Sequence, residues 1–180
     1  AAKDRPSFNP LIVHVADRAA AETLGAFDDR AGTLAERFWP GPLSLVLPRL
    51  PDSGLSLLVS AGLDTVALRA PAHPLARDLL SRFGGPIAAP SANHAGEVSP
   101  TAAAHVAESL GNAVDLIVDG GECEVGLEST VIDLCGARAA ILRHGAVTRE
   151  QLERVLGSID DASVAEPGAA PRSPGQIAKH

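Results

Sequence analysis

Residues 86–101 read PIAAPSANHAGEVSPT. A short apolar run ends at Pro90, small polar residues follow among Ala and Gly, and Ser99-Pro100 leads into an Ala-rich segment. Ser followed by Pro is typical of a helix N-cap and the first helical residue. The stretch therefore predicts a strand, a loop and a helix over 100–110. It also raises the question whether the loop binds a ligand.

The same kinds of segment continue on both sides of this stretch. β-type apolar runs predict further strands at 11–15, 43–48, 65–71, 114–121, 129–134 and 139–145, the last two as a hairpin. Helical patterns predict helices at 18–27 (with Asp17 as a candidate N-cap), 31–38, 73–84 and 148–157. This order of elements predicts an α/β or α+β fold around a mixed sheet.

The composition is that of an ordinary globular domain. Of 180 residues, 46% are hydrophobic and 21% charged, and the net charge is -7. No apolar run approaches the length of a membrane span, so we expect no membrane contact. The two cysteines, Cys123 and Cys135, form neither a disulfide framework nor a zinc pattern, and we expect reduced thiols in a cytoplasmic protein.

Two features of the chain bear on its domain organisation. From Ser158 the sequence is rich in Ala, Pro, Ser and Gly, which predicts a linker over 158–180 after one folded domain over 1–157. The chain has no Met, even at position 1. We therefore expect it to be part of a longer protein.

Several polar residues interrupt strands that otherwise have a buried pattern. His14, Arg69 and Arg143 lie in three different predicted strands, and Ser129 and Thr130 open a fourth. Each alone is compatible with a hydrogen-bonded core residue or with an arginine that reaches solvent. Together, cations and hydroxyls near strand ends are suited to binding an anion, because Arg binds carboxylates and phosphates bidentately.

Further cations precede the first strand. Lys3 and Arg5 are two residues apart, so an extended segment would place both on one face. With Ser and Asn from the loops, they indicate a site for a multiply charged anion such as a nucleoside triphosphate. Since the sequence has no glycine-rich phosphate-binding motif, side chains would hold the phosphates. His14 and Arg69 would hold a second, smaller ligand that carries a carboxylate.

Six segments carry a resemblance to a known family: KDRPSFNPLIVHV (3–15), FWPGPLSLVL (38–47), VALRAPAHPLARDLL (66–80), PIAAPSANHAGEVSPT (86–101), GLESTVIDL (126–134) and ILRHGAV (141–147). In this order they resemble the YrdC-like family of L-threonylcarbamoyl-AMP synthases. The resemblance covers residues 3–157, and the tail resembles the linker of the family's long, two-domain form. It implies a YrdC-like fold: a twisted mixed, mostly antiparallel sheet with flanking helices and a concave active-site face.

The resemblance also implies an activity. ATP, L-threonine and bicarbonate would give L-threonylcarbamoyladenylate and pyrophosphate. Mg²⁺ would accompany the ATP phosphates, and no protein metal site is expected. A separate tRNA threonylcarbamoyl transferase machinery would use the product, and the family's concave face implies contact with tRNA or double-stranded RNA. The family's N-terminal strand with its P-T-E-T-like motif has no match in this sequence, so we expect the chain alone to be incomplete as a catalyst.

Matched by position, the family's functional residues fall into two groups. Lys3 and Arg5 are the implied catalytic, phosphate-binding pair. The implied ATP contacts are Arg5, Asn9, Thr65, Ser91, Asn93, Ser99 and Arg143. The implied threonine contacts are His14, Arg69, Ala89 (through its backbone) and Ser129.

One alternative is a non-catalytic paralogue with an unknown ligand, against which the complete K-x-R, S-A-N and S-T-V set counts. Two further alternatives stay open at the sequence level. The first is an RNA-binding YrdC-like module without adenylation, against which the acidic net charge and the 3% aromatic content count. The second is a carbamoyl-adenylate-forming domain like that of the hydrogenase maturation factor HypF. The lack of zinc-knuckle cysteines in the sequence, and the linker-like tail, count against it.

Overall fold

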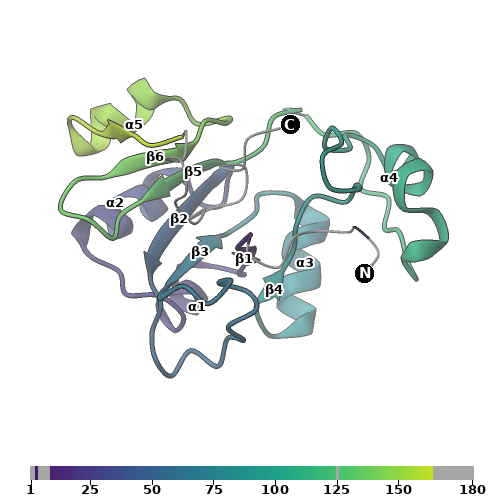
Figure 1. Cartoon of the computed structure of the whole chain (residues 1–180), viewed down its shortest axis with the longest axis horizontal. Coiled ribbons are helices and arrows are strands. Elements are labelled where there is room, and N and C mark those ends of the chain that lie inside the picture. Colours follow the sequence, from purple (N-terminus) through teal and green to yellow (C-terminus); the bar gives the residue numbers. More distant parts are fainter. Residues whose placement is uncertain (1–2, 4–8, 125, 164–180) are drawn as a thin grey trace.

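The computed structural model describes Lys3 and residues 9–124 and 126–163 (Figure 1). The described strands are β1 (Ile12–His14), β2 (Leu43–Pro48), β3 (Thr65–Arg69), β4 (Ile87–Ala88), β5 (Thr130–Asp133), β6 (Ala140–Arg143) and β7 (Asp160–Asp161). The described helices are α1 (Arg18–Glu22), α2 (Asp29–Phe38), α3 (Pro74–Phe83), α4 (Ala103–Leu110) and α5 (Arg149–Leu156), and a 3₁₀ turn, η1 (Gly111–Ala113), follows α4.

The strands form one sheet in the order β4-β1-β3-β2-β5-β6-β7. Antiparallel pairs (β4–β1, β3–β2, β5–β6) alternate with parallel pairs (β1–β3, β2–β5, β6–β7), so neither kind predominates. The predicted α/β fold with a mixed sheet and flanking helices is confirmed. The predicted hairpin is also confirmed, as the β5–β6 pair.

The main core lies between one face of the sheet and the helices α1, α2 and α5. Leu45, Leu68 and Ile132 of the sheet are fully buried there with Leu34 of α2 and Leu152 of α5. Each such side chain stabilises the fold by about 1.5–3 kcal/mol. On the opposite face, every second strand residue contributes to a smaller apolar cluster of Ile12, Val46, Ala67, Val131 and Leu142.

Local signals in the sequence set the ends of several helices. Asp17 accepts a hydrogen bond from the Ala20 N–H at 2.8 Å and caps α1, as predicted. Thr148 and Gln151 form a reciprocal capping box at the start of α5. Gly84 ends α3 in the left-handed conformation, with φ of 70°, which a residue without Cβ adopts readily.

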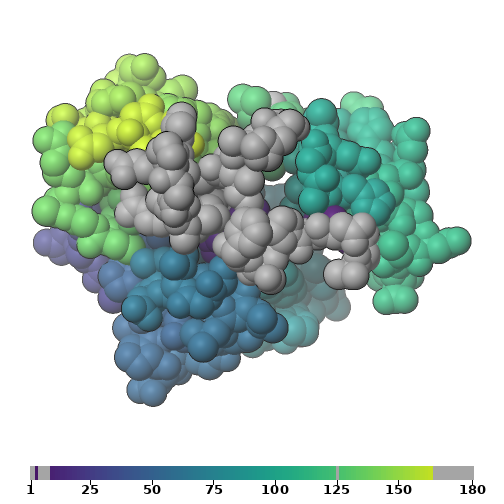
Figure 2. Space-filling model, in the orientation of Figure 1, coloured from purple at the N-terminus to yellow at the C-terminus, as the bar shows by residue number. Residues whose placement is uncertain are grey.

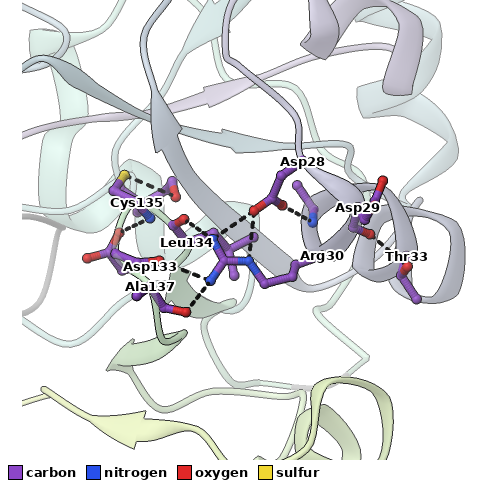
Figure 3. A network of polar contacts seen from close by, with 11 residues as sticks. Asp28, Asp29, Arg30, Thr33, Asp133, Leu134, Cys135 and Ala137 are labelled. Carbon is purple, nitrogen blue, oxygen red and sulfur yellow. Dashed lines mark hydrogen bonds and ion pairs between the residues drawn. The ribbon is translucent and has the colours of Figure 1, made fainter.

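Arg30 of α2 fastens the turn of the β5–β6 hairpin to the helical layer (Figure 3). Its Nε donates to Asp28, the N-cap of α2, at 2.7 Å. Its Nη groups donate to the backbone oxygens of Leu134 (2.8 Å), Gly136 (3.0 Å) and Ala137 (3.2 Å). One guanidinium thus satisfies three carbonyls of a turn more than 100 residues away in sequence.

Two predictions around α4 are wrong. The helix begins at Ala103, not at residue 100, and Ser99 is not its N-cap. Residues 114–121 form no strand, and Leu116 and Val118 are 78% and 65% exposed. β-type residues form a strand only where another strand accepts their backbone hydrogen bonds. In Figure 1 this green segment runs near α4, away from the main sheet, and in Figure 2 the teal and green residues around α4 form a lobe at one end of the molecule.

The packed structure continues beyond residue 157, where the sequence predicted a linker. Ile159 is 1% exposed and belongs to the main core, and β7 pairs with β6 in parallel. A single buried Ile among polar residues gives too weak a pattern to predict a strand. The rest of the predicted linker, 164–180, lies outside the described residues. In the part of the chain that the structure describes, no helix is both long and apolar enough to cross a membrane.

Candidate functional site

The ends of five strands meet at one end of the sheet. His14, which ends β1, is paired with Arg69, which ends β3. β2 starts beside these ends, and its first residue, Leu43, is paired with Thr130 at the start of β5. Arg143, which ends β6, is opposite Val131 of β5. The polar residues that interrupt the predicted strands are therefore brought together.

These polar residues also share one face of the sheet. His14, Arg69, Ser44 and Ser129 are each two residues from a member of the smaller apolar cluster, so their side chains project to that same face. The register of β5 and β6 shifts between Val131 and Ile132, which is a bulge. Because partners in an antiparallel pair point the same way, this bulge turns Arg143 toward the same face as Val131.

Arg143 is held by partners on each of its guanidinium nitrogens. Nε and Nη2 donate to the Ser129 backbone oxygen at 3.0 and 2.9 Å, and Nη2 also donates to Ser129 Oγ at 2.9 Å. Nη1 pairs with Glu128 Oε2 at 2.8 Å. Burial lowers the pKa of Arg143, while Glu128 raises it. The guanidinium is therefore largely buried and oriented before any ligand arrives.

Arg69 has fewer partners. Its Nε donates to the Gly41 backbone oxygen at 3.0 Å. In the described part of the chain no carboxylate forms an ion pair with it. Burial, and then repulsion from Arg143, lower the pKa of Arg69. A half-buried guanidinium beside a second one is an electrostatic position that favours an anionic ligand.

His14 is uncharged at neutral pH. Burial, and then the charge of Arg69, lower the pKa of His14 from an ordinary 6.5 to about 4. The backbone of Ile87 and Ile12 acts in the opposite direction and raises this pKa. Its Nδ1 is buried and has no hydrogen-bond partner among the described residues. A neutral imidazole with one unsatisfied nitrogen is able to exchange a hydrogen bond with a polar ligand group.

Ser44 of β2 and Ser129, which directly precedes β5, are joined through their hydroxyl groups. Their hydroxyl oxygens are 2.9 Å apart, and the two residues are 0% and 3% exposed. Ser129 therefore links Ser44 to Arg143 in one buried polar chain. Ser44 is not among the predicted site residues, although a hydroxyl within the apolar strand 43–48 distinguishes it in the sequence.

The loop after β4 is held together by its own backbone and by Lys3. Lys3 Nζ donates to the backbone oxygens of Ser91 and Asn93. Asn93 is 4% exposed, and its Nδ2 donates to the backbone oxygens of His94 and Glu97, both at 3.0 Å. Asn93 thus shapes the loop from within, whereas Ser91 is exposed on it.

Ser99 joins this loop to the end of the sheet. Its hydroxyl donates to Glu128 Oε1 at 2.8 Å, and the other oxygen of the same carboxylate pairs with Arg143. This contact replaces the predicted helix cap. Glu128 was not among the predicted site residues, although it directly precedes Ser129 in the sequence.

The other predicted site residues are less closely grouped. The Ala89 N–H donates to Ile12 at 3.1 Å, which puts the start of the loop beside β1. Thr65 starts β3 and is four residues from Arg69, about 13 Å along an extended strand. Asn9 is half-buried just before β1. Arg5 lies outside the described residues.

Comparisons with known proteins show which family the chain resembles. A family model described as "Sua5_yciO_yrdC: Telomere recombination" matches residues 1–145. The "Threonylcarbamoyl-AMP synthase" of Bacillus subtilis is 50% identical over 181 residues, which is 99% of this chain and 52% of that protein. The protein of the same name from Pyrococcus abyssi is 48% identical over 159 residues, 88% of this chain and 46% of that protein.

A solved structure is similar over the same region. The "Crystal structure of P. abyssi Sua5 complexed with L-threonine" has a TM-score of 0.90 and 43% identity, and it covers 99% of this chain and 52% of that one. The chain thus spans about half the length of these three proteins. The extent of the family match, together with these identities, shows that the chain belongs to the Sua5/YciO/YrdC family.

Proposed function

We propose that this chain provides the nucleotide- and threonine-binding face of an ATP-dependent threonylcarbamoyl-AMP synthase. The observation that carries the proposal is the cluster of Arg69, Arg143, Ser129 and an uncharged His14 on one face at one end of the sheet. Relatives named as threonylcarbamoyl-AMP synthases, and a related structure whose name records bound L-threonine, support it.

The amino-acid side of the site is built around Arg69. Its Nη groups suit a bidentate bond to the threonine carboxylate. This carboxylate would supply the negative partner that Arg69 lacks within the described residues. Ser129 and the unsatisfied Nδ1 of His14 offer hydrogen bonds to the hydroxyl or amino group. The backbone of Ala89, beside β1, closes the same end.

The nucleotide side is built from Lys3, Arg5 and Arg143, with hydroxyls and amides around them. The hydroxyls and amides proposed to contact ATP are those of Asn9, Thr65, Ser91, Asn93 and Ser99. No group of three or more metal-ligating side chains occurs among the residues that the structure describes. We therefore propose that Mg²⁺ binds through the ATP phosphates, which it commonly does in enzymes that use nucleotides.

The site would join two anions that repel each other. Threonine's amine and bicarbonate give N-carboxythreonine and water. A carbamate oxygen then bonds to the α-phosphorus of ATP, and the bond from that phosphorus to the β-phosphate oxygen breaks, releasing pyrophosphate. Buried guanidiniums lower the barrier because they neutralise charge where both anions meet. The product would pass to a tRNA threonylcarbamoyl transferase, and this face would contact tRNA or double-stranded RNA.

The experiment that tests the proposal is a pyrophosphate assay with ATP, threonine and bicarbonate. We expect release that depends on threonine in the protein that contains this chain, and we expect no release when threonine is replaced by valine, which lacks the hydroxyl. Calorimetry on the 180-residue chain should detect threonine binding. A chain that binds neither threonine nor a non-hydrolysable ATP analogue would contradict the proposal.

A further inference from the structure

The carboxylate of Glu128 connects two elements that are far apart in the sequence. Oε1 accepts from Ser99 Oγ at 2.8 Å, and Oε2 pairs with Arg143 Nη1 at 2.8 Å. Ser99 belongs to the loop between β4 and α4, whereas Arg143 ends β6. Both residues are on the proposed nucleotide side. Within the part of the chain that the structure describes, Glu128 is the residue that hydrogen-bonds to one and forms an ion pair with the other.

The backbone of Glu128 is held by its contacts with Gly145 and Ala146. Its oxygen accepts from the Ala146 N–H at 3.1 Å. Gly145 packs so closely against it that a Cβ at position 145 would stand 2.4 Å from this oxygen. The next residue, Ser129, is the one that binds Arg143. The carboxylate therefore projects from a rigid base next to the guanidinium.

The loop that carries Ser99 has few other ties to the sheet. Its start is bound through the Ala89 N–H to β1, and its middle is bound to Lys3. At the end of the loop, the Thr101 oxygen accepts a hydrogen bond from the Cys123 N–H at 2.8 Å. Cys123 belongs to the lobe around α4 and not to the sheet. Near Ser99, the described contact that reaches the β5–β6 end of the sheet is the bond to Glu128.

We propose that Glu128 is a positioning residue, which holds the Ser99 hydroxyl and the Arg143 guanidinium at the separation that the nucleotide requires. The inference rests on the proposed function, because it assumes that Ser99 and Arg143 contact ATP. It does not make Glu128 a ligand of the substrate. The carboxylate acts by restricting a loop that would otherwise have to be ordered when the nucleotide binds.

Two substitutions separate the charge of Glu128 from its hydrogen bonds. Glu128→Gln keeps an oxygen that accepts from Ser99 but loses the charge that pairs with Arg143. Glu128→Ala removes both. We expect the dissociation constant for a non-hydrolysable ATP analogue to rise from wild type to Gln to Ala, by about tenfold in Ala, the effect of one charge-assisted hydrogen bond. Threonine affinity should change little, because Ser129 still binds Arg143.

The matched control is Glu22→Gln. The side chain of Glu22 is 43% exposed, as is that of Glu128, and it pairs with Arg18 at 2.6 Å on α1. This variant should bind the analogue as wild type does. A double-mutant cycle with Ser99→Ala then tests whether Glu128 acts through Ser99. We expect the double variant Ser99→Ala, Glu128→Ala to bind the analogue no more weakly than the weaker of the two single variants.

The outcomes distinguish this inference from the proposed function. Unchanged analogue affinity in a Glu128→Ala chain with a wild-type unfolding midpoint overturns the positioning role. Tighter binding overturns it too, since Glu128 would then compete with the phosphates for Arg143. If Glu128→Ala does not fold, the analogue affinity of Glu128→Gln is used instead, and unchanged or tighter binding again overturns the positioning role. A wild-type chain that binds no analogue contradicts the proposed function itself and removes the basis of the inference.

Discussion

Arg69 and Arg143 are two half-buried guanidiniums on one face, and burial lowers the pKa of both. Repulsion from Arg143 lowers the pKa of Arg69 further, whereas the carboxylate of Glu128 raises the pKa of Arg143. An unpaired buried charge destabilises a fold by several kcal/mol. At the scale of single residues, the folded chain therefore keeps a positive charge that an anionic ligand would neutralise.

His14 makes the stability of the chain depend on pH. Its pKa is about 4 when folded and 6.5 in an ordinary setting, so between these values the unfolded chain binds more protons. We expect the free energy of unfolding to be unaffected by His14 above pH 6.5, and to fall as the pH drops from 6.5 toward 4. Urea titrations across this range measure the slope.

The variant His14→Gln serves as the direct comparison. In this variant, the unfolding free energy should no longer fall between pH 6.5 and 4 because of residue 14. The variant His105→Gln, at an exposed position of α4, should keep the wild-type dependence on pH. A slope that is the same in wild type and His14→Gln would contradict the low pKa of His14.

The sequence indicates the residues of the candidate site more readily than it indicates their partners. His14, Arg69, Arg143 and Ser129 are recognisable because a polar residue inside an apolar strand needs an explanation. Ser99 is misread, because Ser before Pro is a strong local signal for a helix cap. Its actual partner, Glu128, is 29 residues away, and nothing in the local pattern of either residue predicts that contact.

Among the elements, α2 and the β5–β6 hairpin are joined by Arg30, whose guanidinium binds Asp28 and three turn carbonyls (Figure 3). The helix and the hairpin are each predicted from the sequence, since caps, periodicity and turn residues are local. The contact between them is not, because it depends on tertiary packing. Tertiary packing also explains why residues 114–121 form no strand. These residues have β propensity, but a strand also needs a neighbouring strand to pair with.

We expect Arg30→Ala to destabilise the chain by about 1.5–3 kcal/mol, because it leaves carbonyls of the hairpin turn without a charged donor. The measurement is urea unfolding followed by circular dichroism. Arg37→Ala, an exposed position at the other end of α2, is the control and should be close to neutral. Equal stability of Arg30→Ala and Arg37→Ala would show that the turn does not need this anchor.

At the scale of the whole molecule, the sheet order brings residues from across the chain to one place. β1 and β3 are parallel neighbours, and β2 and β5 are parallel neighbours, so the ends that carry His14, Arg69, Ser129 and Arg143 meet although 129 residues separate the first from the last. No pattern within a single segment predicts this arrangement. The family resemblance does, because it carries the topology with it.

We propose that threonine binds at this end of the sheet through Arg69. Calorimetric titration of threonine into wild type, Arg69→Lys and Arg69→Ala tests it most directly. The control is Arg82→Ala, whose arginine pairs with Asp78 on the exposed side of α3. A guanidinium makes a bidentate bond to a carboxylate that an ammonium cannot copy, so Lys should restore binding only in part.

We expect Arg69→Ala to weaken threonine binding by roughly tenfold to a hundredfold, and binding of the ATP analogue far less. An RNA-binding module predicts instead a change in RNA affinity and in its salt dependence, with no effect of threonine. Equal threonine affinity in wild type and in a folded Arg69→Ala chain would contradict threonine binding through Arg69.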